Sequence, residues 1–325
     1  MHPTSPLVSI CIPTYQAASW IAETLASALA QDHLLLEVVI SDDASTDGTL
    51  DIVESIKDER LRVLPPGPSA GMAANWNRSI RAARGEYVKL LMQDDLLEPD
   101  CVSAMAAVLD RHPAVGFVFS PRTVLLDDPA DAKAQRWRDR FANLHDRLEP
   151  LGERNEGRLL FEAMKRDRFR LNCFGEPTAV MVRRAAFERV GLFAERMPQL
   201  LDEEMWLRLA YFFDVGFVPR PLVTIRVHDA SATSRNNRAG SAWLDPLWML
   251  EGLREHPEIR GDLSGTTEIR LVLGTLKREA RRALVTRSRG FRRYARDVGE
   301  YLRFRRTRPR PTLHESLPPV GTAAP

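Results

Sequence analysis

Cysteine is scarce in this chain of 325 residues: Cys11, Cys101 and Cys173 are the only three, and they lie far apart. An odd number of isolated cysteines argues against a disulfide framework and against a Cys-x-x-Cys metal site. We therefore expect three reduced thiols in a folded core. The opening residues, MHPTSPLVSI, lack the basic and apolar regions of a secretion signal, so we expect a cytoplasmic protein.

Long hydrophobic runs are also missing. Leu34–Leu36 and Val38–Ile40 are interrupted by charge well before the ~20 apolar residues of a membrane-spanning helix. The first strand-like run lacks a following Gly-x-Gly-x-x-Gly, which excludes the dinucleotide fingerprint of a dehydrogenase. A hydrophobic content of 44% excludes a disordered chain. The sequence is that of a folded globular protein.

Charge is balanced over the whole chain, with 46 basic and 44 acidic side chains, but it is unevenly distributed. Residues 1–259 carry 30 basic and 38 acidic side chains, whereas residues 260–325 carry 16 basic and 6 acidic ones. Apolar residues are interleaved with the arginines of 260–310, which is typical of a basic amphipathic helix. Such a helix can associate peripherally with an anionic membrane or pack its apolar face on the protein, and both alternatives stay open. A nucleic-acid partner is not expected, because no recognisable binding motif accompanies the arginines.

Strands and helices are predicted to alternate along the first part of the chain. Apolar residues at helical spacing follow the first two strand-like runs, at Ile21, Leu25 and Leu29 and again at 50–56 behind Asp47. The alternation indicates an α/β fold with a mostly parallel sheet and flanking helices. The strand-like runs are Val8–Ile12, Val38–Ile40, Leu61–Leu64, Tyr87–Met92, Val115–Phe119, Ala179–Val182 and Val215–Val218.

The expected organisation is a domain over residues 1–240 and a basic helical extension over 241–325. The domain divides into a nucleotide-binding half, 1–125, and an acceptor-side half, 126–240. The regular pattern loosens between 127 and 172, where we expect an insertion or mobile face.

Carboxylates crowd the loops that follow the predicted strands, where open parallel sheets bind ligands. Asp94-Asp95 directly follows an apolar strand, and a divalent cation would offset the repulsion between two adjacent carboxylates. The alternative is an acidic turn that opens a helix over Leu96–Leu109. The segment Asp42–Asp47 also suits an ordinary turn.

Four sequence elements in this order and spacing resemble glycosyltransferase family 2. They are VSICIPTY at 8–15, ISDDASTDGT at 40–49, the segment 71–95 ending in LLMQDD, and DEEMWLRL at 202–209 with RVHDAS at 226–231. The resemblance covers roughly residues 7–235. It implies the Rossmann-related GT-A fold and a sugar-nucleotide donor.

The resemblance also implies particular site residues. A divalent metal, Mn²⁺ or Mg²⁺, would be held by Asp95 and Asp94 with help from His228. Asp202 would be the catalytic base, with Glu203 as the substitute. The nucleotide-binding residues it implies are Pro13, Thr14, Tyr15, Asp42, Asp43, Gly71, Asn77 and Asp94.

These residues predict a metal-dependent glycosyltransferase that inverts the anomeric configuration, because a single base on the acceptor side favours direct displacement. The expected donor is a nucleoside-diphosphate sugar, most simply a UDP-sugar. The expected acceptor is a hydroxyl of a glycan or lipid-linked molecule in surface polysaccharide synthesis, with the enzyme free in the cytoplasm or peripheral at the inner face of the membrane. A catalytically silent sugar-nucleotide-binding module and a nucleotidyltransferase are the alternatives, but residues 13–18 lack the Gly-rich phosphate loop of the latter.

Overall fold

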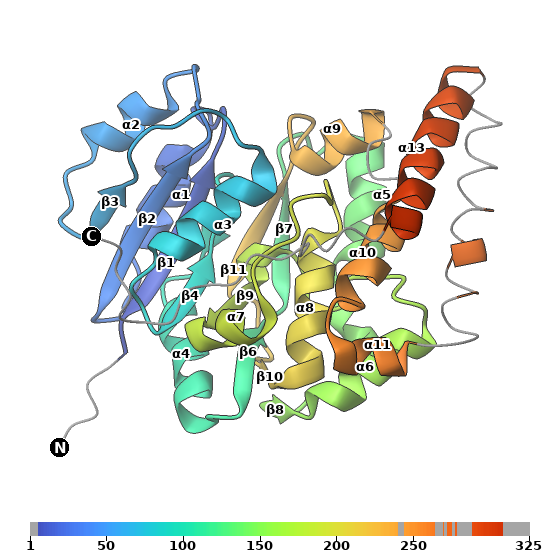
Figure 1. Cartoon of the computed structure of the whole chain (residues 1–325). Helices are drawn as coiled ribbons and strands as arrows, with labels where there is room; N and C mark the ends of the chain where they lie inside the picture. Colours follow the sequence, from blue (N-terminus) through green and yellow to red (C-terminus); the bar gives the residue numbers. More distant parts are fainter. Residues whose placement is uncertain are drawn as a thin grey trace.

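An eight-stranded sheet in the order β3-β2-β1-β4-β9-β6-β10-β8 forms the centre of the computed structural model (Figure 1). A smaller sheet has the order β5-β11-β7. The structure describes residues 6–239, 244–263, 269, 272–274, 277 and 288–307. The strands are β1 (Val8–Thr14), β2 (Leu36–Asp42), β3 (Leu61–Val63), β4 (Tyr87–Leu90), β5 (Leu96–Leu97), β6 (Val115–Phe119), β7 (Arg122–Leu126), β8 (Arg154–Asn155), β9 (Val180–Arg183), β10 (Asp214–Phe217) and β11 (Val223–Val227).

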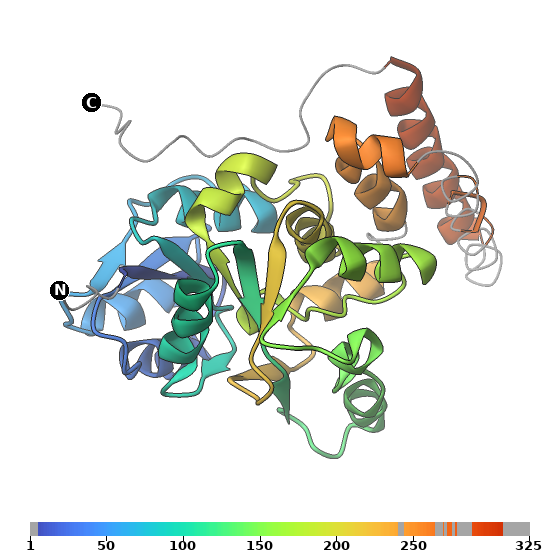
Figure 2. The same ribbon diagram turned by 90° about the horizontal axis from the view of Figure 1, so that it is seen from below.

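Helices cover both faces of the large sheet, as the view from below shows (Figure 2). The α-helices are α1 (Ile21–Leu29), α2 (Thr49–Ser55), α3 (Met72–Ala82), α4 (Cys101–Arg111), α5 (Ala132–Phe141), α6 (Gly157–Arg166), α7 (Arg184–Val190), α8 (Leu201–Phe212), α9 (Ala232–Ala239), α10 (Asp245–Leu253), α11 (Pro257–Asp262) and α13 (Ser288–Thr307). Two short 3-10 helices are η1 (Leu144–Leu148) and η2 (Pro177–Ala179).

The large sheet is mostly parallel, as predicted. β1 pairs in parallel with β2 and β4, β2 with β3, and β6 with β10. β9 runs antiparallel between β4 and β6 and thereby joins the two halves of the chain into one sheet. Each of the seven predicted strands is present, and the two predicted helices are α1 and α2.

Two hydrophobic cores lie on opposite faces of this sheet, because successive side chains of a strand point to opposite sides. In β1, Ile10 and Ile12 pack in the core that contains α1, α2 and α4. Cys11 packs in the other core, with α3, α7 and α8. Strands buried on both faces read as continuous apolar runs, which is why the sequence identified them.

The segment 127–172, where an insertion or mobile face was expected, contains more regular structure than the sequence pattern indicated. It forms α5, η1, β8 and α6. In α6 the side chains of Leu160, Phe161 and Met164 are buried and pack in the same core as α8. Charged residues on the outer surface concealed this helical spacing in the sequence.

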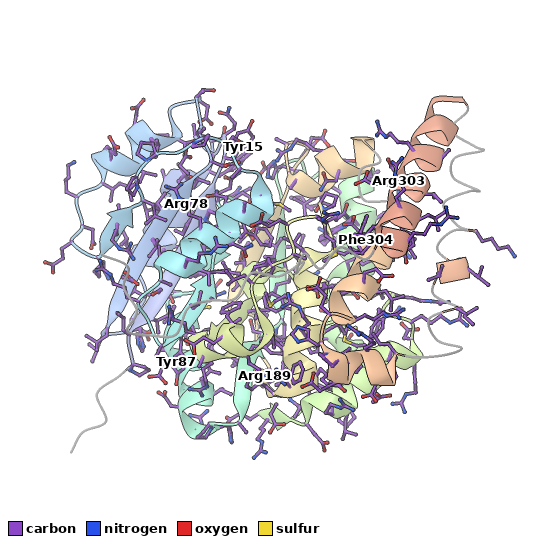
Figure 3. All side chains as sticks on the ribbon, viewed as in Figure 1. Tyr15, Arg78, Tyr87, Arg189, Arg303 and Phe304 are labelled. Atoms are coloured by element: carbon purple, nitrogen blue, oxygen red, sulfur yellow. The ribbon has the colours of Figure 1, made fainter. Side chains whose placement is uncertain are left out.

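The expected domain boundary at residue 240 divides a continuous core. Met249 and Leu253 of α10 and Ile259 of α11 belong to the same buried cluster as α8. Within the described ranges 244–263 and 288–307 the extension forms α10, α11 and α13, and α13 packs on α10 through Tyr301, which is 1% exposed. Phe304 lies on the side of α13 that faces α10, where its ring meets Trp248 edge-on (Figure 3). Tyr301 and Phe304 thus pack on the protein, as one of the two alternatives for the apolar residues of 260–310 expected.

The three cysteines are free and buried, as expected. Burial raises the pKa of Cys11 to about 12 and that of Cys101 to about 11, so both thiols stay protonated and unreactive at neutral pH. Across the described ranges, no helix is both long and apolar enough to cross a bilayer.

The contact between α6 and α8 allows a test of the fold. A Cβ atom added at Gly157 would lie 1.9 Å from the carbonyl oxygen of Phe213 and 2.3 Å from that of Ala210. Because these are backbone atoms, they cannot rotate away. We predict that Gly157→Ala lowers the free energy of unfolding by about 3 kcal/mol in urea denaturation.

Gly67→Ala is the matched control, because a Cβ at Gly67 meets nothing within 4 Å. Equal midpoints and slopes for the two variants would show that α6 does not dock on α8 as described.

Candidate active site

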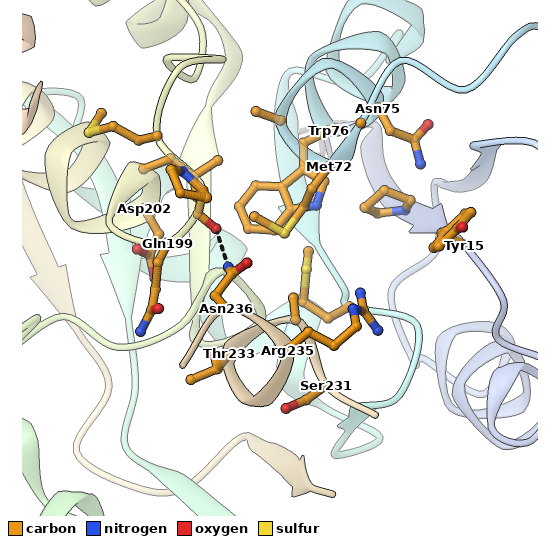
Figure 4. A pocket seen from close by; sticks show the side chains of 18 of the residues that line it. Tyr15, Met72, Asn75, Trp76, Gln199, Asp202, Ser231, Thr233, Arg235 and Asn236 are labelled. Carbon is orange, nitrogen blue, oxygen red and sulfur yellow. Dashed lines mark hydrogen bonds between the residues drawn. The ribbon is translucent and has the colours of Figure 1, made fainter. Parts of the chain in front are cut away.

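A cavity of about 790 Å³ opens beyond the carboxyl ends of β1, β2 and β4. This is the edge where open parallel sheets bind ligands, and the volume lies within the range of small-molecule sites. Figure 4 shows Tyr15 and Asp202 at opposite sides of the cavity, with Trp76 and Met72 between them. Residues from both halves of the sequence thus face the same space.

The structure brings most of the predicted site residues to this cavity and leaves four outside its lining. The four outside are Asp42, Asn77, Glu203 and His228. Those that line it are Pro13, Thr14, Tyr15, Asp43, Gly71, Asp94, Asp95 and Asp202.

Asp42 and Asp43 have different roles although they are adjacent. The carboxylate of Asp42 accepts hydrogen bonds from Thr14 Oγ1 at 2.8 Å and from the hydroxyl and backbone N–H of Ser45 at 2.6 and 2.7 Å. Its bonds fix the end of β2 to the end of β1. Of the two, only Asp43 lines the cavity.

Asp43 also shapes the loop that leads into α3. Its carboxylate accepts hydrogen bonds from Ser69 Oγ at 2.9 Å and from the backbone N–H groups of Ala70 and Gly71 at 2.6 and 3.0 Å. Gly71 has φ of 90°, a left-handed conformation that glycine adopts without strain. The hydrogen bonds to Asp43 and the backbone conformation of Gly71 together set where α3 begins beside the cavity.

Asn77 holds the fold rather than a ligand, and its assignment to the nucleotide is corrected. Its side chain is fully buried. The side-chain amide donates to Phe193 O at 2.9 Å, and its oxygen accepts from Phe193 N at 2.9 Å. The residue of this helix that reaches both strand ends is Asn75, which lines the cavity, donates to Thr14 O and accepts from Ser41 Oγ at 2.6 Å.

The acidic pair is held by groups from distant parts of the chain. Asp95 accepts hydrogen bonds from Thr178 Oγ1 at 2.6 Å and from Arg226 N at 2.9 Å. Burial, followed by the negative charge of Asp94, raises the pKa of Asp95 well above its usual value. Asp94 Oδ2 lies 2.8 Å from His228 Nε2. The chain continues from Asp95 into β5, and α4 begins only at Cys101, so the pair does not open a helix.

The donor atoms of this group suit a divalent cation. Asp94 Oδ1 has no hydrogen-bond partner among the residues that the structure describes, and within the same residues His228 Nδ1 is buried without one. Carboxylate oxygens are the ligands that Mg²⁺ and Mn²⁺ prefer. Asp94 and Asp95 would be the direct ligands and His228 would orient Asp94 from behind.

Two residues that support the pair were not found from the sequence. Lys89 is fully buried in β4 and donates hydrogen bonds to the carbonyl oxygens of Thr178 and Val180, the latter at 3.3 Å. Burial lowers the pKa of Lys89 to about 8. Thr178 also accepts a hydrogen bond from Met92 N at 3.0 Å, so its hydroxyl spans both ends of the acidic loop. A lysine inside the apolar run YVKLL is the signal that could have identified this arrangement.

Asp202 lies in the first turn of α8 on the other side of the cavity. Its carboxylate accepts hydrogen bonds from Asn172 Nδ2 at 3.0 Å and from Glu203 N at 2.8 Å. Burial raises the pKa of Asp202 to about 7, and the negative charge of Glu176 adds to the rise. Near neutral pH this group can therefore both accept and release a proton.

Glu203 points away from the cavity, so its role as the substitute base is corrected. Its side chain is buried, and it does not line the cavity. Burial, followed by the charge of Asp202, raises the pKa of Glu203 well above its usual value. The side chain is thus part of the core.

A third acidic side chain, Glu176, lines the cavity at the start of η2. Its Oε2 lies 2.7 Å from Nε of the buried Arg122, which makes an ion pair. The negative charge of Glu176 raises the pKa of both Asp95 and Asp202, so the three carboxylates act on one another across the cavity. An added cation would relieve that repulsion.

With this geometry established, comparison with known proteins identifies the family. The sequence profile of Glycosyl transferase family 2 matches residues 9–191, more than half of the chain. The chain therefore belongs to glycosyltransferase family 2.

Two curated relatives illustrate the match. The uncharacterized protein MT1568 of Mycobacterium tuberculosis is 34% identical over 235 residues, which are 72% of this chain and 72% of that protein. The succinoglycan biosynthesis protein ExoO of Rhizobium meliloti is 35% identical over 111 residues, 34% of this chain and 31% of ExoO. The match to ExoO thus spans about a third of that protein.

Two solved structures share the fold. TarS 1–349 of S. aureus in complex with UDP-GlcNAc superposes with a TM-score of 0.53 and 21% identity, over 70% of this chain and 60% of TarS. The mannosyltransferase PcManGT of Pyrobaculum calidifontis, in complex with GDP-Man and Mn²⁺, gives a TM-score of 0.53 and 19% identity, over 92% of this chain and 81% of PcManGT. These matches confirm the predicted GT-A fold.

The surroundings of Asp202 predict how its pKa responds to its neighbours. Asn172→Ala removes a hydrogen bond to the carboxylate and should raise the pKa of Asp202, because the charged form loses a donor. Glu176→Gln removes a nearby negative charge and should lower it. We would follow the ¹³C carboxyl signal of labelled aspartate by NMR, assigned with Asp202→Asn, and shifts in the same direction for both variants would contradict this geometry.

Proposed function

We propose that this glycosyltransferase transfers a sugar from a nucleoside-diphosphate donor, with the help of a divalent metal, to an acceptor hydroxyl activated by Asp202. One observation carries the proposal. The pair Asp94-Asp95 and the carboxylate of Asp202 come from different halves of the chain and line the same cavity. A leaving group at one side and an attacking hydroxyl at the other is the arrangement that direct displacement requires.

The donor end is formed by Tyr15, Asp43 and Asn75. Tyr15 is 43% exposed, and its backbone N–H and C=O are both bonded to the side chain of Gln93, at 2.6 and 3.1 Å. A fixed, accessible aromatic ring suits stacking on a nucleotide base. Asp43 can accept a hydrogen bond from the imide N–H of uracil, which favours a UDP-sugar. TarS, with UDP-GlcNAc, and PcManGT, with GDP-Man, show that this fold accommodates either nucleotide class.

Asp94 and Asp95 would hold the cation, Mn²⁺ or Mg²⁺. When bound, the cation neutralises negative charge on the diphosphate. Thr178 and Arg226 N keep the carboxylate of Asp95 in place, and His228 does the same for Asp94. The Mn²⁺ in the PcManGT complex supports this assignment.

Asp202 would accept the proton of the attacking hydroxyl. Its pKa of about 7 leaves a large deprotonated fraction at neutral pH and makes it a better base than an ordinary aspartate. Glu176 also lines the cavity, but its carboxylate is already paired with Arg122 and is therefore less suited to accept the proton. One base on the acceptor side predicts inversion at the anomeric carbon.

The acceptor would be a hydroxyl of a glycan or of a lipid-linked saccharide in surface polysaccharide synthesis. The likeness to ExoO, a protein of succinoglycan biosynthesis, supports a polysaccharide pathway. Peripheral membrane association through 260–310 stays a proposal, and the exposed side chain of Arg306 on α13 supports it.

Asp202→Asn tests the base. We predict that kcat for transfer falls by about 10²–10⁴-fold while UDP affinity is unchanged, because the amide cannot accept the proton. Glu203→Gln is the matched control: this neighbouring side chain is buried and does not line the cavity, so transfer should persist. Equal losses in the two variants, or undiminished transfer by Asp202→Asn, would exclude Asp202 as the base.

The metal site is tested by thermal unfolding with UDP, GDP, dTDP or CMP, each with and without Mn²⁺. A ligand that binds only the folded state raises the midpoint temperature of unfolding. At a concentration 100 times its Kd it raises the free energy of unfolding by about 2.7 kcal/mol. We predict a shift with UDP that requires Mn²⁺ and is lost in Asp95→Ala but kept in the exposed control Asp32→Ala. A shift that is independent of Mn²⁺, or that survives in Asp95→Ala, would contradict the metal assignment.

A further inference from the structure

The cavity extends beyond Asp202 into a region built by the C-terminal helices. Trp248 of α10 and Asp297 and Glu300 of α13 line it, together with Arg196 and Gln199 from the loop before α8. All five lie outside residues 9–191, the part that the family profile matches. This end of the cavity is therefore a feature of this chain rather than of the matched domain.

The charge pattern of α13 is aligned with the cavity. Residues 288–307 contain seven arginines but only two acidic residues, Asp297 and Glu300, which lie three positions apart. Residues at this spacing share one face of a helix. Both acidic residues line the cavity. The basic helix thus presents its acidic residues to the active site.

Packing against α10 holds α13 in this orientation. The ring of Trp248 meets that of Tyr301 edge-on with centroids 5.5 Å apart, and that of Phe304 at 5.1 Å. Tyr301 Oη also donates a hydrogen bond to Glu251 at 2.9 Å. Asp245, the first residue of α10, accepts hydrogen bonds from the backbone N–H groups of Gln199 and Leu200 at 2.8 and 3.0 Å. The C-terminal helices are consequently tied to the segment that carries Asp202.

The chemistry of this region suits a sugar ring. Trp248 is half-buried and offers an aromatic surface to the cavity, where it can pack on the C–H groups of a pyranose. Carboxylates accept hydrogen bonds from sugar hydroxyls. Asp297, Glu300 and Gln199 carry oxygen acceptors and line the same cavity, and Asp297 Oδ1 also accepts a hydrogen bond from Arg296 Nε at 3.3 Å.

The balance of charge disfavours an anionic sugar. Around this end, five carboxyl groups line the cavity, against two guanidinium groups, those of Arg196 and Arg235. The guanidinium of Arg196 lies 5.5 Å from the ring centroid of Phe304 and 5.9 Å from that of Trp248, and Arg235 donates to Ala230 O. Among the carboxylates, Asp297 is paired with Arg296 at 3.3 Å, and the excess of carboxyl groups rests on the other four. A uronate or phosphate would meet a negative field here. The carboxyl groups are Glu195, Asp202, Asp245, Asp297 and Glu300.

We propose that Trp248, Asp297 and Glu300 form an acceptor subsite that takes an uncharged sugar residue and rejects a uronic acid. The proposal rests on the proposed function, because it identifies the acceptor for the base Asp202. It makes α13 part of the active site.

The test uses p-nitrophenyl glucoside and galactoside and their uronide counterparts, which differ from them by one carboxylate. Binding to the full-length protein is measured by saturation-transfer NMR, with and without UDP and Mn²⁺. We expect saturation transfer from the protein to the neutral glycosides and at least tenfold weaker binding of the uronides. Trp248→Ala should abolish binding of the neutral glycosides. The double variant Asp297→Asn with Glu300→Gln should reduce the ratio of glycoside affinity to uronide affinity at least threefold.

Arg306→Ala is the control, because Arg306 is exposed on the same helix and does not line the cavity. The isosteric Asp297 and Glu300 changes decide the outcome even where Trp248→Ala fails to fold. Absence of glycoside binding in a protein that binds UDP and Mn²⁺, or equal binding of uronides and glycosides, would overturn the subsite and leave the proposed function intact. Glycoside binding without any effect of UDP and Mn²⁺ would instead count against the proposed function.

Discussion

The hydrogen bond from Thr178 to Asp95 is the interaction on which the site depends. Two adjacent carboxylates at the end of a buried strand repel each other, so their positions must be imposed by surrounding groups. Thr178 donates to Asp95 while it accepts from Met92 N, and its own carbonyl is held by the buried Lys89. Because η2 leads into the antiparallel strand β9, this contact fixes the acceptor-side half against the nucleotide-binding half.

The same geometry brings three carboxylates toward one cavity. Glu176 lies two residues before Thr178 in the same turn, and its negative charge raises the pKa of both Asp95 and Asp202. Mutual repulsion favours proton uptake at Asp202 and cation binding at Asp94-Asp95. The raised pKa of Asp202 and a pair of carboxylates suited to a cation, on opposite sides of one cavity, are thus two consequences of one arrangement. Arg122 forms an ion pair with Glu176 beside them.

Much of the fold could be predicted from the sequence because buried parallel strands read as uninterrupted apolar runs. The acidic pair and Asp202 were likewise visible as motifs. The choice between Asp42 and Asp43 was not, because adjacent residues in a loop point in directions set by their hydrogen bonds. The assignments of Asn77 and Glu203 failed for a related reason: polar residues on a helix can serve the core instead of the cavity.

Features that depend on contacts between residues far apart in the chain could not be predicted from the sequence. The acidic residues of α13 line the cavity only because the helix packs on α10, which lies about fifty residues earlier in the chain. The small sheet of β5, β7 and β11 was missed because two of its strands follow other strands directly and the third has only two residues. These contacts place Arg226 N beside Asp95.

The central claim is that the metal and the base lie on opposite sides of a bound nucleotide sugar. The most direct measurement is a crystal structure with UDP and Mn²⁺, with data collected at the manganese absorption edge. The account predicts one anomalous peak between the carboxylates of Asp94 and Asp95 and the diphosphate, with the uracil beside Tyr15 and Asp43 and Asp202 facing the β-phosphate across the cavity. A manganese peak away from Asp95, or a nucleotide bound on the side of Asp202, would contradict it.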